Sequence, residues 1–156
     1  LITAILAAAA IGIFEATIEK VVTLAILMPI VASMGGIAGM QSLALVIRSQ
    51  ALDQIGSSNS KLLIFKEASI GFLNGILWST VVALAVYFWF DSIFLGIVIA
   101  SALMINLIIG AISGVSLPLV LAKFKIDPAL AGGVILTTIT DIVGFISLLG
   151  IATIIL

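Results

Sequence analysis

The chain alternates between long apolar segments and short polar breaks, a pattern that predicts a bundle of membrane-spanning helices. Charged residues, prolines and an aromatic cluster separate five apolar segments from one another. A helix needs about 20 mainly apolar residues to cross a bilayer, and the segments are of that order. They lie at about 1–17, 21–47, 68–90, 93–122 and 129–156. We therefore expect an all-α membrane protein with five transmembrane helices, forming a single transmembrane domain over residues 1–156.

Composition supports this assignment and excludes several kinds of chemistry. Hydrophobic residues make up 63% of the chain and charged residues 8%, and the mean hydropathy is +1.49, whereas soluble domains carry about 25% charged residues. The chain has no Cys and no His, which excludes thiolate sites and removes the commonest general base. We expect no enzyme activity, a lipid bilayer around the protein, and no nucleic-acid partner.

The first residues, "LITAILAAAAIGIF", lack a basic leader and read as a helix that is already under way. We therefore expect the first segment to be part of a span whose beginning lies upstream.

The basic residues predict the orientation in the membrane. Five of the six lie in alternate polar breaks, which must share one side of the membrane. They are Arg48, Lys61 and Lys66 after the second segment, and Lys123 and Lys125 after the fourth. Only Lys20 lies on the other side. The positive-inside rule makes the first group cytoplasmic. For five spans, the N-terminus is then cytoplasmic and the C-terminus lies outside the cell.

Asp141 is the main candidate for a functional site. It follows a threonine-rich turn in the last segment and precedes fifteen mostly apolar residues, so it is expected near the middle of the bilayer. A charge there costs at least ~2.5–3.5 kcal/mol on insertion scales and normally faces a partner or a water-filled path. The sequence suggests no second buried charge to pair with it. This pattern favours a cation or proton site over the alternative, a protonated acid bonded to a neighbouring helix.

Thr137 and Thr138 are expected on the same helix face as Asp141, because they precede it by four and three residues. Their hydroxyls could orient water around an ion. Alternatively, each could bond the carbonyl four residues earlier in its own helix and serve structure alone.

The second segment contains the richest local pattern, "MPIVASMGGIAGMQSLALVIR". Its proline and glycines permit a kink, an unwound stretch or a close approach between helices. The candidate pore-lining residues here are Ser33, Gly35, Gly36, Gly39 and Gln41. The spacing of Gly35 and Gly39 also fits a small-xxx-small packing face, and both interpretations stay open.

The remaining polar residues suggest structural roles. Asn74 and Asn106 are lone amides in apolar helices, typical of hydrogen bonds between helices. Asp127 followed by Pro128 indicates a helix start. Asp53 and Glu67 read as ordinary acids of a loop or a helix start.

Two long stretches carry a resemblance to a known family. These are "FEATIEKVVTLAILMPIVASMGGIAGMQSLALVIR" and "DPALAGGVILTTITDIVGF", with further likeness at "GFLNGILWS" and "FLGIVIASALMINLIIGAISGVSLPLVL". The chain resembles the membrane domain of the MgtE family of magnesium channels. The resemblance implies a homodimer with five spans per subunit and an ion path along the twofold axis, lined by the second and fifth spans. Asp141 matches the family's conserved acid, and the paired Asp141 side chains would hold a largely hydrated Mg²⁺.

The chain also departs from the family pattern. Members usually read "GGNAGNQS" or similar, and here Ile37 replaces an asparagine and Met40 a polar residue. Gly133, a further pore-lining candidate, stands where some members carry an amide. The cytosolic N-domain and CBS pair that many members carry upstream are absent from this chain.

The sequence thus predicts a dimeric divalent-cation channel or transporter in the cell membrane, with Mg²⁺ as the transported ion and Asp141 as its metal site. The alternative is a secondary transporter that uses Asp141 as a proton or Na⁺ carrier, and a membrane scaffold is a third class.

Overall fold

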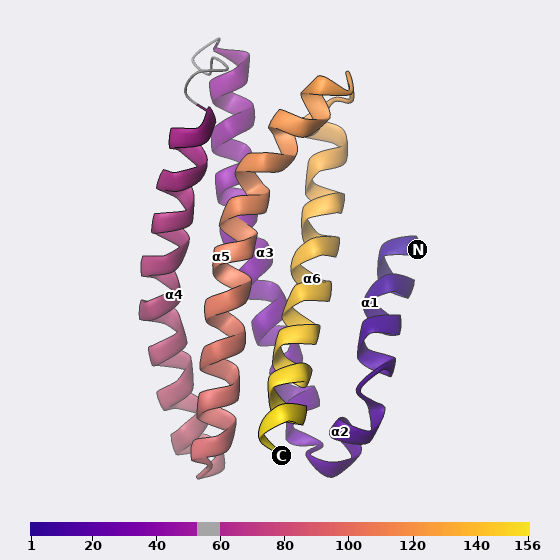
Figure 1. Ribbon diagram of the computed structural model, residues 1–156, viewed down its shortest axis with the longest axis vertical. Coiled ribbons are helices and arrows are strands. Elements are labelled where there is room, and N and C mark those ends of the chain that lie inside the picture. The colour runs from indigo at the N-terminus through magenta and orange to yellow at the C-terminus, as the bar shows by residue number, and fades with distance from the viewer. Residues whose placement is uncertain (53–59) are drawn as a thin grey trace.

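The structure is a computed structural model, and it describes residues 1–52 and 60–156, all of whose regular elements are α-helices (Figure 1). Their bounds are α1 Ile2–Gly12, α2 Glu15–Lys20, α3 Thr23–Ala51, α4 Ser60–Phe90, α5 Ile93–Lys123 and α6 Pro128–Ile155. Asp53 and the predicted polar loop around Gly56–Ser60, apart from the helical backbone of Ser60, lie outside the described residues.

Four helices of the described part are long and apolar enough to cross a membrane, which confirms the all-helical membrane fold. They are α3, α4 from Leu62 onward, α5 and α6. Each contains 28 to 31 residues, or at least ~42 Å at 1.5 Å per residue, and so exceeds the ~30 Å hydrocarbon core. These helices match the second to fifth predicted spans.

The predicted first span is not one continuous helix. α1 has 11 residues and ends at Gly12, and α2 begins at Glu15 after a break at Ile13 and Phe14. Eleven residues rise only about 16 Å, too little to cross a bilayer. α1 runs beside α6 and reaches about half of its height (Figure 1). A hydroxyl–hydroxyl hydrogen bond of 2.7 Å joins Thr17 of α2 to Thr153 of α6.

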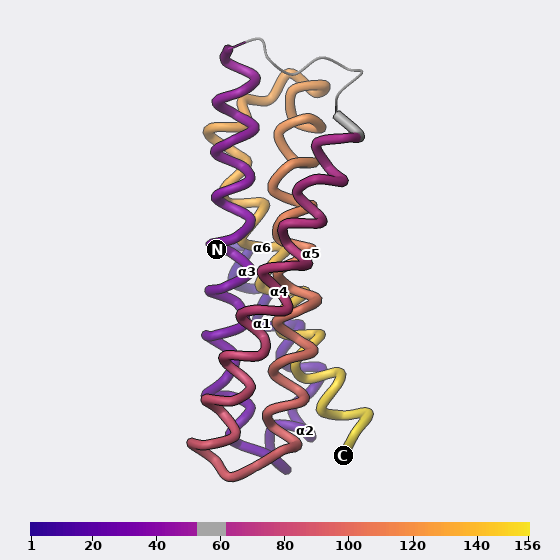
Figure 2. Tube along the Cα trace, turned by 90° about the vertical axis from the view of Figure 1, so that its left-hand side faces the viewer, coloured from indigo at the N-terminus to yellow at the C-terminus, as the bar shows by residue number. Residues whose placement is uncertain are grey.

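α5 is the central helix, since it packs against α3, α4 and α6. One half of the bundle is filled by a conventional apolar core at the end that carries α2. This core joins Leu27 and Val31 of α3, Ile99 and Leu103 of α5, and Leu148 of α6. α3 and α4 both pack against α5 and have little direct contact with each other among the described residues. Figure 2 gives the view at right angles to Figure 1.

Toward the other end, glycine replaces large side chains at the helix contacts. A Cβ atom on Gly39 would lie 2.9 Å from the carbonyl oxygen of Gly110, and one on Gly110 would lie 2.5 Å from that of Gly35. Gly114 of α5 likewise abuts the backbone at Gly39. The backbones of α3 and α5 therefore touch, as small-xxx-small packing allows. Of the two interpretations left open by the sequence, pore lining and helix packing, Gly35 and Gly39 serve helix packing in this structure.

Of the alternatives left open for the second segment, the unwound stretch does not occur, because α3 continues through Pro29 and its glycines without interruption. A proline removes one backbone donor, and transmembrane helices tolerate this where neighbouring groups satisfy the freed carbonyl. α5 likewise continues as one helix through Pro118, and it leans over near its C-terminal end (Figure 1). The predicted start of the last helix is confirmed: Asp127 Oδ1 accepts a 2.9 Å hydrogen bond from the Ala129 N–H, and Pro128 follows the cap.

We predict that Gly110→Ala destabilises the bundle by about 1–3 kcal/mol, since the added methyl group meets backbone that has no room to move. Gly36→Ala is the matched control, because its Cβ would lie 3.7 Å from Thr140 Oγ1, an ordinary contact. Thermal unfolding of both purified variants in detergent measures the difference. Equal melting temperatures for the two variants would contradict close glycine packing as the source of stability.

Candidate functional site

An open groove runs along the face where α3 and α6 lie side by side. Its volume is about 580 Å³. α3 contributes Ala32, Ser33, Gly36, Ile37, Met40, Gln41 and Ala44, and α6 contributes Thr137 and Asp141. Five of the candidates named from the sequence, from two segments about a hundred residues apart, therefore share one surface: Ser33, Gly36, Gln41, Thr137 and Asp141.

Asp141 occupies the midpoint of α6, with thirteen helical residues before it and fourteen after. Its side chain is partly exposed to the groove. Because α6 is a membrane-spanning helix, this places a carboxyl group at mid-bilayer depth on an open face. Such a group is tolerated where the face meets water or another polypeptide.

The threonines beside Asp141 donate their hydroxyl hydrogens to the backbone of α6. Thr137 Oγ1 lies 3.1 Å from the carbonyl oxygens of both Gly133 and Val134, and Thr138 Oγ1 lies 2.7 Å from that of Val134. Thr140 is fully buried and bonds Leu136 in the same way. Thr137 lines the groove, and because its hydroxyl hydrogen is used within α6, its oxygen can only accept hydrogen bonds from the groove.

Acceptors are what a hydrated cation requires of its surroundings. Its inner-shell waters turn their oxygens to the ion and their hydrogens outward, so the lining must accept hydrogen bonds. Asp141 supplies carboxylate oxygens, and Thr137, Ser33 and the amide oxygen of Gln41 add neutral ones. Mg²⁺ in particular keeps several waters and is bound through few carboxylates.

Other candidates from the sequence lie outside the groove lining. Gly35 and Gly39 face α5. Gly133 lies beside Met40, and Thr138 is partly buried. The small apolar residues Ala32 and Ala44, which also line the groove, carry no chemical signal in the sequence, so sequence reasoning missed them.

Asn106 of α5 holds the two groove-forming helices together. It is fully buried, and its Nδ2 donates a 2.7 Å hydrogen bond to the carbonyl oxygen of Val31 in α3. The amide rests directly on Gly35 of α3 and on Gly144 of α6. The expected role of Asn106 as a hydrogen bond between helices is confirmed, whereas Asn74 is exposed.

Glu67 is buried, whereas the sequence predicts an ordinary acid of a loop or a helix start. It is 6% exposed and accepts a 2.7 Å hydrogen bond from Ser42 Oγ of α3, in a buried contact that links α4 to α3. Asp141 is therefore not the sole acid buried in the helices. A charged residue near a helix start gives no sequence signal of burial, because the partner that buries it is 25 residues away.

Comparison with known proteins identifies the family. The model of a family described as a divalent cation transporter, MgtE, matches residues 28–151, which includes the whole groove. The chain belongs to the MgtE family.

Named relatives agree with this assignment. The chain is 40% identical over 143 residues to the "Magnesium transporter MgtE" of Bacillus subtilis, covering 92% of this chain and 32% of that protein. Proteins of the same name from Thermus thermophilus and Enterococcus faecalis are 29% and 28% identical, over 92% and 90% of this chain and 32% and 31% of theirs. The chain spans about a third of the length of these relatives. MgtE membership confirms that the chain belongs with transport proteins rather than enzymes.

Proposed function

We propose that the chain forms the ion path of a divalent-cation channel or transporter whose main cargo is Mg²⁺. The observation that carries the proposal is the groove between α3 and α6, with Asp141 at mid-depth and acceptor groups from both helices around it. The relatives' printed name, magnesium transporter, supports Mg²⁺ as the cargo. Mg²⁺ is here a transported ion and not a catalytic cofactor.

The proposal requires two copies of the chain. The groove holds a single carboxylate, Asp141, and no three acidic side chains gather within residues 1–52 and 60–156. A twofold axis beside the groove would bring two Asp141 side chains to one ion and bury exposed Ile37 and Met40. The open groove thus supports a homodimer in which the hydrated ion lies between the subunits.

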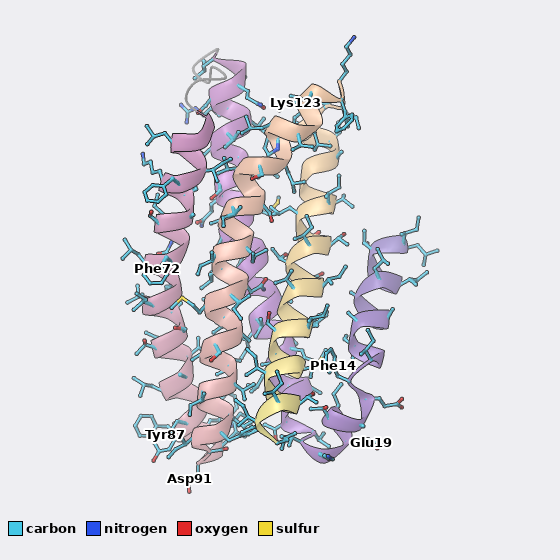
Figure 3. All side chains as sticks on the ribbon, in the orientation of Figure 1. Phe14, Glu19, Phe72, Tyr87, Asp91 and Lys123 are labelled. Carbon is cyan, nitrogen blue, oxygen red and sulfur yellow. The ribbon has the colours of Figure 1, made fainter. Side chains whose placement is uncertain are left out.

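The same proposal includes the arrangement in the cell membrane. Lys123 lies at one end of the bundle, and Glu19 and Asp91 lie at the other (Figure 3). By the positive-inside rule the Lys123 end faces the cytoplasm and the C-terminus lies outside the cell. α1 and α2 would belong to a fifth span with a cytoplasmic N-terminus, and residues 1–156 would act as one transmembrane domain.

A coupled carrier is the alternative in which Asp141 binds a proton or Na⁺. Its partly exposed position suits that chemistry too. Uptake that depends on the proton or Na⁺ gradient would favour the carrier, whereas single-channel currents would favour the channel.

We predict that Asp141→Asn folds normally and lowers Mg²⁺ flux at least about tenfold, because replacing charge with a neutral amide weakens the hold on a divalent ion by more than ~1.4 kcal/mol. The measurement is Mg²⁺ uptake into liposomes at matched protein content. Asp91→Asn is the control, since Asp91 is exposed in the turn between α4 and α5, where its φ of 47° suits Asn equally. Wild-type flux through Asp141→Asn would reject the ion site.

We also predict a loose filter, in which Mn²⁺ or Co²⁺ competes comparably with Mg²⁺. Ile37 and Met40 place apolar atoms where polar side chains could bond the hydration shell, and filters of this kind select by cavity size and ligand geometry. The double variant Ile37→Asn with Met40→Asn should prefer Mg²⁺ more strongly. Competition between the ions in reconstituted protein, with each single variant alongside, measures this. Ion ratios that stay at the wild-type values in the double variant would exclude these positions from the filter.

A further inference from the structure

A second polar recess lies on the other flank of α3, between α3 and α4, and we call it the Glu67 crevice. It consists of two adjoining cavities of about 210 and 280 Å³ that share Ala38, Gln41 and Asn74. Glu67 and Ser42 line the first cavity, and Leu107 and Ala111 of α5 contribute lining residues to the second and the first respectively. The crevice exists because α5 separates α3 from α4 along most of their length.

Glu67 is the chemical centre of this crevice. Burial of an ionised carboxylate is costly unless its oxygens are satisfied, and Ser42 Oγ supplies one hydrogen bond at 2.7 Å. A carboxylate offers about four lone-pair positions, so Ser42 uses only part of its capacity. The Ser42 hydroxyl donates this bond to one oxygen of the Glu67 side chain, and no other side-chain hydrogen bond to Glu67 is present among the described residues.

The other polar groups of the crevice are amides that lie open at its surface. Gln41 and Asn74 are both exposed and line both cavities. Amide groups within membrane-spanning helices need water, an ion or protein beside them. The cavity beside Glu67 has room for about seven waters at ~30 Å³ each, enough for an ion that keeps most of its hydration shell.

The crevice adjoins the Asp141 groove. Gln41 and Ile37 of α3 line both spaces, so a single ridge of side chains separates them. Glu67 lies seven residues into α4 from the end of the bundle that carries the basic residues, whereas Asp141 lies thirteen residues into α6 from that same end. The two carboxylates therefore stand at successive depths.

We propose that the Glu67 crevice is a second divalent-cation site, in which Glu67 holds a hydrated Mg²⁺ on the basic side of the bilayer, next to the path through Asp141. The negative carboxylate excludes an anionic ligand, and the small cavity with its amide oxygens fits a hydrated ion better than an acyl chain. The choice of ion rests on the proposed function, but the site does not depend on Asp141.

The test uses the natural absence of cysteine. Ile70→Cys introduces one thiol in the crevice, three residues from Glu67 at a partly exposed position. Its reaction rate with N-ethylmaleimide is measured in the full-length protein, in detergent, with and without Mg²⁺. A bound ion should slow labelling about tenfold at a Mg²⁺ concentration roughly ten times its dissociation constant. Glu67→Gln, which has nearly the same shape and still accepts from Ser42, should abolish this protection.

Two further variants distinguish an ion bound at Glu67 from an ion bound at Asp141 and from a purely structural role of Glu67. Ala44→Cys in the Asp141 groove should lose its Mg²⁺ protection with Asp141→Asn and keep it with Glu67→Gln, so failure of the proposed function and failure of this site give different results. Ser42→Ala breaks the link between α3 and α4 but leaves the carboxylate, and should keep protection at position 70.

Two results would overturn the proposal: a labelling rate at Ile70→Cys that Mg²⁺ does not change, or equal loss of protection in Ser42→Ala and Glu67→Gln, which would make Glu67 a structural clamp. If Glu67→Gln does not fold, judged by its elution volume and melting temperature, Glu67→Asp replaces it. Protection that survives in Glu67→Asp and scales with Mg²⁺ supports the site, and its absence there rejects it.

Discussion

The contact between the backbones of α3 and α5 is the constraint on which the rest of the structure depends. Gly35 and Gly39 of α3 meet Gly110 and Gly114 of α5 with no room for a Cβ atom between them. Lipid tails are as apolar as leucine, so helices in a membrane gain little from hydrophobic burial and associate through close packing and hydrogen bonds. The Asn106 amide completes this contact by bonding the Val31 carbonyl between the two glycine-lined helices.

This contact also decides where the polar residues of α3 point. With its glycine face against α5, α3 presents Ser33, Met40 and Ala44 on one flank beside α6, and Ser42 on the other flank toward α4. Gln41 stands between them and lines both recesses. The buried glycine contact between α3 and α5 thus leaves two polar surfaces at membrane depth. One includes Asp141 of α6, and the other includes Glu67 of α4. A cation path built from such surfaces needs no large ligand cage, because Mg²⁺ keeps most of its water.

Sequence reasoning predicted what depends on local pattern. Four spans, the Asp127 cap, the Asn106 hydrogen bond and the membership in a transporter family are confirmed. The groove candidates Asp141, Thr137 and Gln41 could be named because polar residues are rare in apolar helices. Three features needed the fold: the continuity of α3 through Pro29, the break near Gly12, and the burial of Glu67. The burial of Glu67 involves Ser42, a residue 25 positions earlier, and a local pattern does not encode such a contact.

The central claim is that two Asp141 side chains share one hydrated divalent ion on a twofold axis. The most direct measurement is a crystal structure of the protein grown with Mn²⁺, an ion that can be located by its anomalous scattering. We expect one anomalous peak on the axis of a homodimer, flanked by both α3–α6 grooves, with the carboxylates of both subunits turned toward it through water. Asp141 side chains that face lipid or pack apart, with no ion between the subunits, would contradict the claim.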